Sequence, residues 1–151
     1  MGYKPWRVFL DTSALLAGLI SSKGAARGIM AAGEMGLLEL LVSTDVLTEA
    51  DRNIARKFPH LIDEYRSFLH HVAPTLVEDP TLKEIKAVVP WVGKDDAPIL
   101  AAALKIRADY LVTWNTRDFM SPRMPKGLAT KIVTPGGFVE DWTAYFKDWP
   151  V

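Results

Sequence analysis

Four acidic residues that lie far apart in the chain have the surroundings expected of a shared site. They are Asp11, Glu49, Asp96 and Asp118. Asp11 directly follows a short apolar run, and Asp118 lies shortly after another. Carboxylates that are crowded together repel one another, and a hard divalent cation relieves that repulsion. Because oxygen ligands suit Mg²⁺ or Mn²⁺ better than zinc, the set predicts a Mg²⁺- or Mn²⁺-binding site.

A site of this kind supports hydrolysis of a phosphodiester bond. Bound divalent ions activate a water molecule and stabilise the charge that develops on the phosphate oxygens and the leaving group. The chain contains no cysteine. This excludes a thiol nucleophile, a zinc–thiolate centre and a disulfide scaffold.

Each acid also has a purely structural interpretation. Asp11 is typical of a residue that caps the next helix, and Asp118 is typical of a turn. Glu49 borders the apolar stripe of its predicted helix, so its exposure stays open. Asp96 continues the core-facing line of its helix, where a carboxylate needs a partner. Of the adjacent pair, we therefore assign chemistry to Asp96 and a capping or supporting role to Asp95.

The elements that must position these acids are alternating strands and helices. Strands are expected over 6–10, 38–42, 75–77, 110–113 and 131–134, and helices over 12–20, 23–35, 45–57, 60–72, 82–89, 96–107 and 135–146, with a loop over 121–126. Pro90 is expected to close its helix. The alternation predicts an α/β fold with a mainly parallel sheet, and functional groups gather beyond the carboxyl ends of such strands.

Length and composition restrict the class of protein. The 151 residues fit a single domain over 1–151. Lys plus Arg and Asp plus Glu both number 18, so the formal net charge is zero. That balance disfavours a binder driven by a basic tail and leaves room for a local basic patch. Since no apolar segment reaches membrane-spanning length and no secretory signal is recognisable, we expect a cytoplasmic protein without a membrane partner.

Four sequence blocks around the acids resemble, in the same order, the motifs of PIN-domain ribonucleases. The blocks are Val8–Leu16, Val42–Glu49, Asp96–Ala103 and Ala108–Phe119, and Ile132–Phe138 resembles the usual last strand and turn. The resemblance implies a three-layer α/β/α sandwich with a mainly parallel central sheet. It also implies cleavage of single-stranded RNA that depends on Mg²⁺ or Mn²⁺.

The same resemblance implies roles for individual residues. It places Asp11, Glu49, Asp96 and Asp118 in the acidic site, and Thr12, Ser13, Thr113 and Asn115 around it as polar support. The fourth block departs from the commoner family pattern, which has Asp at the position of Asn115. An Asn-x-x-Asp-Phe variant also occurs in the family and matches this chain. Which of Asn115 and Asp118 completes the site is therefore open.

The resemblance also suggests partners. Many small members of the family are toxins of the VapC type, which are often dimeric and are inhibited by a small antitoxin protein. It therefore implies single-stranded RNA as substrate, an antitoxin partner and a homodimer. Other members process RNA without an antitoxin.

Contacts with the phosphates of a substrate require basic residues near the acidic blocks. The candidates are Lys23, Arg27, Arg52, Arg56, Lys94, Arg117, Arg123 and Lys126. We select Arg52, which follows Glu49 at i+3 on the same helix face, and Arg117, which adjoins Asp118. Four tryptophans are expected to make core or dimer contacts: Trp91, Trp114, Trp142 and Trp149. Trp114 differs from the others because it adjoins the predicted site.

Other functions are weighed against this one. A non-catalytic module that binds RNA or a protein on the same fold is the alternative, and the changed fourth block favours it. A haloacid-dehalogenase-like phosphotransferase is disfavoured, because Ser13 stands where the second Asp of its motif is needed. A dinucleotide-binding Rossmann site is disfavoured, because residues 12–20 lack the Gly-x-Gly-x-x-Gly pattern.

Overall fold

A computed structural model describes residues 3–147 and contains a five-stranded parallel sheet. The strands are β1 (Trp6–Leu10), β2 (Leu38–Val42), β3 (Thr75–Leu76), β4 (Tyr110–Val112) and β5 (Lys131–Val133). Their order across the sheet is β3-β2-β1-β4-β5. The predicted α/β fold with a parallel sheet is confirmed.

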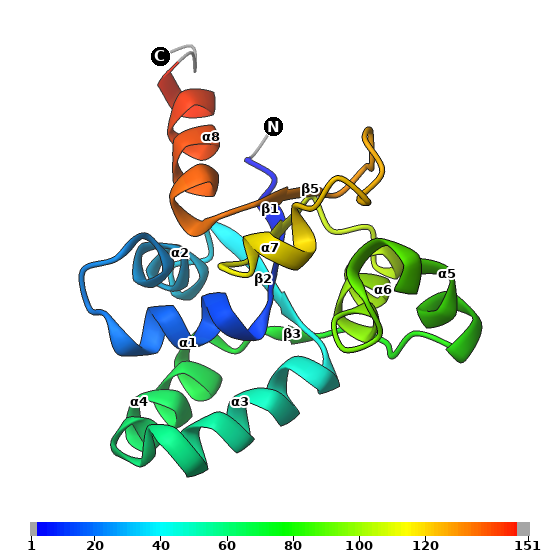
Figure 1. Cartoon of the computed structure of the whole chain (residues 1–151). Coiled ribbons are helices and arrows are strands. Elements are labelled where there is room, and N and C mark those ends of the chain that lie inside the picture. The colour runs from blue at the N-terminus through cyan, green and yellow to red at the C-terminus, as the bar shows by residue number, and fades with distance from the viewer. Residues whose placement is uncertain (1–2, 148–151) are drawn as a thin grey trace.

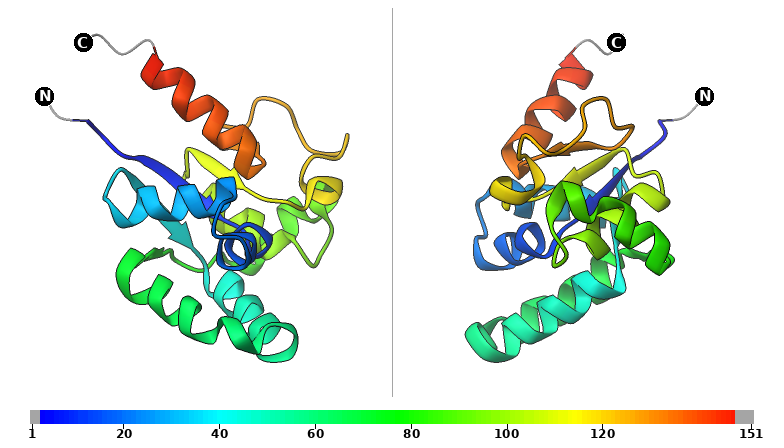
Figure 2. Two further views of the ribbon diagram at one scale, coloured as in Figure 1. Left: turned by 90° about the vertical axis from the view of Figure 1, so that its left-hand side faces the viewer. Right: turned by 45° about the vertical axis from the view of Figure 1, so that its right-hand side comes forward.

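Helices cover both faces of the sheet. They are α1 (Thr12–Ile20), α2 (Ala25–Glu34), α3 (Thr44–Lys57), α4 (Ile62–Ser67), α5 (Leu82–Val92), α6 (Ala97–Lys105), α7 (Thr116–Phe119) and α8 (Pro135–Lys147). Figure 1 shows α1 and α2 on one side of the strands and α5 and α6 on the other, which gives three layers. The views in Figure 2 show α8 extending away from the body of the molecule.

The central strand β1 fixes the position of the site. Val8, Phe9 and Leu10 are almost completely buried, because helices cover both faces of the strand. The chain passes from β1 outward to β2 and β3, and then returns to place β4 on the other side of β1. The direction of winding therefore reverses between β1 and β4. In open parallel sheets, ligands bind in the crevice beyond the carboxyl ends of the strands at such a point.

Two expected elements differ from the structure. The helix expected over 60–72 is divided into a 3-10 turn (Pro59–Leu61), α4 and a π-helical turn (Phe68–Val72). The segment that follows Asn115 forms α7 instead of an open turn, since the Asn115 side chain caps it. The loop expected over 121–126 is confirmed, because these residues form neither helix nor strand.

Pro90 does not close its helix, because α5 continues to Val92. A proline in the last turn leaves unpaired the carbonyl group four residues earlier, and here that residue is the exposed Lys86, whose surroundings water can reach. The helix ends at Gly93, where φ is 83° and ψ is 165°. This backbone conformation is almost restricted to glycine, and it turns the chain toward Asp96.

The predicted tryptophan contacts are only partly found. Trp91 and Trp142 pack against the core as partly buried side chains. Trp114 is 53% exposed, so the expectation of a core contact was wrong for this residue. Trp149 lies outside the described residues. None of the helices within residues 3–147 has both the length and the apolar character that a membrane span requires.

Candidate functional site

Asp11 lies at the carboxyl end of β1, where the direction of winding reverses between β1 and β4. Its backbone N–H donates to the carbonyl oxygen of Val112 in β4 at 3.1 Å. Its Oδ1 accepts the Ser13 N–H at 2.5 Å, and its Oδ2 accepts a hydrogen bond from the Thr113 hydroxyl. Asp11 therefore caps α1, as its structural interpretation predicted, and also faces β4. Burial raises the pKa of the Asp11 carboxyl group, although hydrogen bonds from Thr113 and Ser13 oppose this shift.

Two hydroxyl groups join the start of α1 to the chain that follows β4. Thr113 is completely buried, and its Oγ1 accepts the Asn115 N–H at 2.9 Å. The Ser13 Oγ accepts the Trp114 N–H, also at 2.9 Å. Since these hydroxyls accept the N–H groups of Trp114 and Asn115, and the Thr113 hydroxyl also bonds to Asp11, they fix residues 113–115 against the end of β1.

Glu49 reaches the same region from α3. Ser43 caps this helix by accepting the Val46 N–H at 3.3 Å, and the cap places Glu49 in the second turn. The Glu49 Oε2 accepts a hydrogen bond from the Thr12 hydroxyl at 2.9 Å. Glu49 is partly buried, which answers the question that its helical pattern left open.

Asp96 and Asp118 are joined by the amide group of Asn115. Asp96 immediately precedes α6, but its side chain makes no capping hydrogen bond. Its Oδ2 instead accepts from the Asn115 Nδ2 at 3.3 Å, and the same nitrogen donates to the Asp118 Oδ2 at 3.1 Å. The Asn115 Oδ1 accepts the Asp118 N–H at 3.4 Å and so caps α7. Asn115 therefore acts here as a bridge between two acids.

The electrostatics show that the four acids act on one another. Burial first, then a hydrogen bond with Asp118 and the charges of Asp118, Asp11 and Glu49, together raise the pKa of Asp96 to about 7. Hydrogen bonds from Asn115 and then Arg117 lower the pKa of Asp118. Negative charge on Asp96 is therefore disfavoured by its surroundings.

The other predicted residues lie differently. Asp95 is exposed and, within residues 3–147, makes no side-chain hydrogen bond or ion pair. Arg117 is 89% exposed, and its Nε lies 3.4 Å from the Asp118 Oδ1. Arg52 is exposed on α3, one turn beyond Glu49.

Arg27 is not free to bind a phosphate, although it was a candidate on sequence grounds. Its guanidinium group donates to the carbonyl oxygens of Gly18 at 2.5 Å and Leu19 at 3.2 Å, and it pairs with Glu64 at 2.9 Å. These contacts hold the end of α1 against α2 and α4. The remaining basic candidates are all exposed: Lys23, Arg56, Lys94, Arg123 and Lys126.

The side chains that bond to the four acids were all singled out from the sequence. Trp114 was expected to make a core or dimer contact; it makes no core contact, and the dimer contact stays a prediction. Its position directly after a predicted strand, between Thr113 and Asn115, was the signal that pointed to the site. The contacts show which residues lie together, and the chemical role of each stays a prediction.

The donor set fits a hard divalent cation in its chemistry. The carboxylate and hydroxyl groups supply oxygen ligands, and a cation would neutralise the negative charges of Asp118, Asp11 and Glu49, which act on Asp96 in addition to its burial. The side chains are not preassembled, however. Within residues 3–147, no group of three or more His, Asp or Glu side chains is arranged so that it could hold a metal ion.

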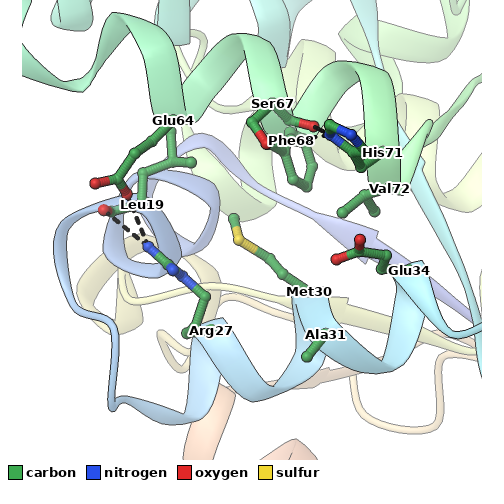
Figure 3. A pocket seen from close by; sticks show the side chains of 10 residues that line it. All are labelled: Leu19, Arg27, Met30, Ala31, Glu34, Glu64, Ser67, Phe68, His71 and Val72. Carbon is green, nitrogen blue, oxygen red and sulfur yellow. Dashed lines mark hydrogen bonds and ion pairs between the residues drawn. The ribbon is translucent and has the colours of Figure 1, made fainter.

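A separate cavity of about 360 Å³ lies between α2 and the segment of α4 and the following π-helical turn. Figure 3 shows the apolar side chains of Met30, Phe68 and Val72 inside it, with the Arg27–Glu64 ion pair at one end. None of the four acids lines this cavity. It is therefore distinct from the acidic site.

Comparison with known proteins identifies related sequences and folds. A family model described as "PIN domain" matches residues 7–117. No curated protein matches the chain. The family match includes Asp11, Glu49 and Asp96, and it ends one residue before Asp118.

Similar folds are found among solved structures. VapBC2 from Rickettsia felis, solved bound to a DNA fragment from its promoter, has a chain with 16% identity and a TM-score of 0.58, and the match covers 83% of this chain and 97% of that one. PAE2754 from Pyrobaculum aerophilum has 18% identity and a TM-score of 0.61, and the match covers 97% of this chain and 100% of that one. FitAcB from Neisseria gonorrhoeae has 14% identity and a TM-score of 0.59, and the match covers 85% of this chain and 98% of that one. At these identities the likeness is one of fold.

Proposed function

Because this chain belongs to the PIN-domain family, we propose that it is a Mg²⁺- or Mn²⁺-dependent endoribonuclease that cleaves single-stranded RNA. PIN domains are generally nucleases, and PIN nucleases typically use divalent metals. The observation that carries the proposal is that four acids from four distant segments lie near the carboxyl ends of β1 and β4, where the direction of winding reverses. Hydrogen bonds support this proximity, because the Thr113 and Thr12 hydroxyls bond to Asp11 and Glu49, and the Asn115 amide bonds to both Asp96 and Asp118.

In this proposal Asp11, Glu49, Asp96 and Asp118 hold the metal. When bound, the metal activates water and stabilises the charge that develops on the phosphate during hydrolysis. The hydroxyl of Thr113 and the N–H of Ser13 orient the Asp11 carboxylate, and the Thr12 hydroxyl orients Glu49. Side chains that are held in this way need less reorganisation during the reaction.

Asn115 and the basic residues have supporting roles in the same proposal. The Asn115 amide positions Asp96 and Asp118 relative to each other. The exposed Arg117 and Arg52 contact phosphates on either side of the bond that is cleaved. Asp95, which the sequence suggested as a capping or supporting residue, has no role in this proposal, because it is exposed and makes none of these contacts.

A VapC-type toxin is the biological role that we propose for this nuclease. The family blocks resemble those toxins, and two structural neighbours come from VapBC2 and FitAcB, which are toxin–antitoxin complexes. This supports an antitoxin protein as partner, and a homodimer in the cytoplasm is part of the same proposal. Co-purification with the product of a small neighbouring reading frame would test the antitoxin, and light scattering would test the dimer.

The test of the nuclease uses a single-stranded RNA labelled at one end. We expect cleavage with Mg²⁺ or Mn²⁺, no cleavage with EDTA, and a rate lower by orders of magnitude in Asp11→Asn. Asp95→Asn is the matched control and should keep wild-type activity. Activity of Asp11→Asn at the wild-type rate would contradict the proposal.

The second candidate function is a non-catalytic module that binds RNA or a protein. The Asn115 amide favours it, because a neutral group lies between Asp96 and Asp118 where the commoner family pattern would add a carboxylate. Retention of single-stranded RNA without cleavage, across Mg²⁺, Mn²⁺ and Ca²⁺, would support this candidate over the enzyme.

A further inference from the structure

Trp114 combines a fixed backbone with an exposed ring. Its N–H donates to the Ser13 Oγ at 2.9 Å, its neighbour Thr113 bonds to Asp11, and its neighbour Asn115 bonds to Asp96 and Asp118. The backbone of Trp114 is therefore part of the network that orients the acidic site. Its side chain, however, is 53% exposed.

This exposure distinguishes Trp114 from the other tryptophans of the described chain. Trp6, Trp91 and Trp142 pack against the hydrophobic core, whereas Trp114 is absent from that core and its immediate lining. Among residues 3–147, the ring contacts within the typical range of aromatic pairs involve Trp6 and Trp142 but not Trp114. Folding therefore gains less from the Trp114 ring than from the tryptophans packed on the core, because apolar stabilisation grows with the buried area.

The chemistry of an indole ring at this position matches an unpaired nucleobase. Proteins that bind single-stranded RNA stack its splayed bases on aromatic side chains, and every base offers a π-face. Tryptophan provides a large contact area with only two side-chain torsions to fix. The guanidinium group of Arg117, three residues along the chain, is 89% exposed and supplies positive charge for the phosphates.

We propose that the indole ring of Trp114 stacks on an unpaired base of the RNA strand, next to the phosphodiester bond that lies at the acidic cluster. This inference rests on the proposed ribonuclease function and names how that site holds its substrate. The ring contributes to affinity and to the position of the cleaved bond, and it takes no part in the chemistry itself. Trp114 is thus a positioning residue.

The test measures binding of a labelled single-stranded oligoribonucleotide by fluorescence anisotropy, in an Asp11→Asn background that does not consume the ligand. We expect Trp114→Ala to weaken binding by roughly 5- to 150-fold. Trp114→Phe should restore most of the affinity, and Trp114→Leu should restore little, because leucine is apolar but has no π-face. The folded state of each variant is checked by its thermal unfolding.

Tyr145→Ala is the matched control. Tyr145 is an exposed aromatic residue, 42% exposed, that packs against Trp6 at the amino end of β1, at the opposite edge of the sheet. Its removal should leave the RNA affinity unchanged. This control separates stacking near the acidic cluster from a general loss of aromatic surface.

A series of oligonucleotides with a single abasic position locates the stacked base. With Trp114 present, one abasic position should weaken binding much more than its neighbours, and in Trp114→Ala that difference should disappear. The active protein should then cleave next to that position. Equal affinity of Trp114→Ala and its parent, or equal losses with every abasic oligonucleotide, would overturn the inference while the ribonuclease function stands.

Failure of the underlying function gives a different result. In that case the protein with Trp114 intact neither binds nor cleaves single-stranded RNA, and both proposals fall together. A Trp114→Ala variant that binds RNA normally but loses an antitoxin partner would assign the ring to a protein contact and would likewise overturn stacking.

Discussion

The hydroxyl group of Thr113 donates a hydrogen bond to the Oδ2 of Asp11, which joins the carboxyl ends of β4 and β1. Both side chains are buried, Thr113 completely and Asp11 to all but 4%. A buried carboxyl oxygen that loses its donor costs free energy and also loses its fixed orientation. The stability of the fold and the geometry of the proposed active site therefore depend on the same bond.

Replacing Thr113 by valine should lower both stability and activity. Valine keeps the shape of the side chain, but it leaves the Asp11 Oδ2 and the Asn115 N–H without their partner. We expect the free energy of unfolding to fall by about 1–3 kcal/mol, measured by urea denaturation. RNA cleavage should fall as well, because the Asp11 carboxylate is no longer oriented.

Thr130→Val is the control for this prediction. Thr130 is also buried, and its hydroxyl donates to the Ala108 carbonyl oxygen at 2.7 Å, away from the acids. This variant should lose a comparable amount of stability and keep its cleavage rate below the unfolding transition. If both variants lose activity in proportion to stability, Thr113 has a structural role only.

Parts of this fold follow from local sequence, and others depend on long-range contacts. The bounds of β1 and β2 were predicted correctly, because buried parallel strands are continuous apolar runs. The end of α5 was not, since an exposed Pro90 in a last turn costs little and Gly93 ends the helix instead. The division of the helix expected over 60–72 has no signal that we recognised in its local pattern.

In the candidate site, too, some features follow from local sequence and others depend on long-range contacts. Asp11 was recognisable because it ends an apolar strand, but the pairing of β1 with β4 joins residues about a hundred positions apart, and local patterns carry no information about it. The bridge that Asn115 forms between Asp96 and Asp118 likewise depends on how α6 and α7 are placed. Arg27 was misjudged for this reason, because only tertiary packing reveals its contacts with α1.

Asp96 should make the stability of the metal-free protein depend on pH. Burial, followed by the neighbouring carboxyl groups, raises its pKa from 3.8 to about 7. The folded protein therefore retains a proton that the unfolded chain has already released, and a rise in pH from about 4 to 7 lowers the free energy of unfolding. In EDTA, the melting temperature of the wild type should fall across this window relative to that of Asp96→Asn.

The matched control for the pH dependence is Asp95→Asn. Asp95 is exposed and outside the acidic cluster, so this variant should keep the wild-type dependence. Addition of Mn²⁺ should reduce the loss of stability at pH 7, because the cation neutralises the deprotonated carboxylates. Identical pH profiles for the wild type and Asp96→Asn would contradict the raised pKa.

Replacing Asn115 by aspartate should increase the dependence of stability on metal. The amide now donates to both Asp96 and Asp118, and an added carboxylate there repels them instead. The metal-free variant should therefore be less stable than the wild type, and Mn²⁺ should raise its melting temperature by a larger amount. Differential scanning fluorimetry over a series of Mn²⁺ concentrations measures both effects.

Asn115→Ala separates charge from hydrogen bonding in this comparison. It removes the bridge and adds no carboxylate, so it should lower stability without a larger response to Mn²⁺. An Asn115→Asp variant that responds to Mn²⁺ no more strongly than the wild type would show that residue 115 lies away from the metal.

Replacement by alanine should affect stability at Arg27 and RNA affinity at Arg117. Arg27 donates to the carbonyl oxygens of Gly18 and Leu19 and pairs with Glu64, so its loss should lower the free energy of unfolding by about 1.5–3 kcal/mol and leave RNA affinity unchanged. Arg117 is 89% exposed, and its loss should change stability by less than about 0.5 kcal/mol. It should instead weaken RNA binding and reduce the slope of log affinity against log salt concentration by about 0.7 for each lost phosphate contact. Urea denaturation and anisotropy titrations at several salt concentrations measure these effects, and an unchanged salt slope in Arg117→Ala would remove this residue from the RNA contact.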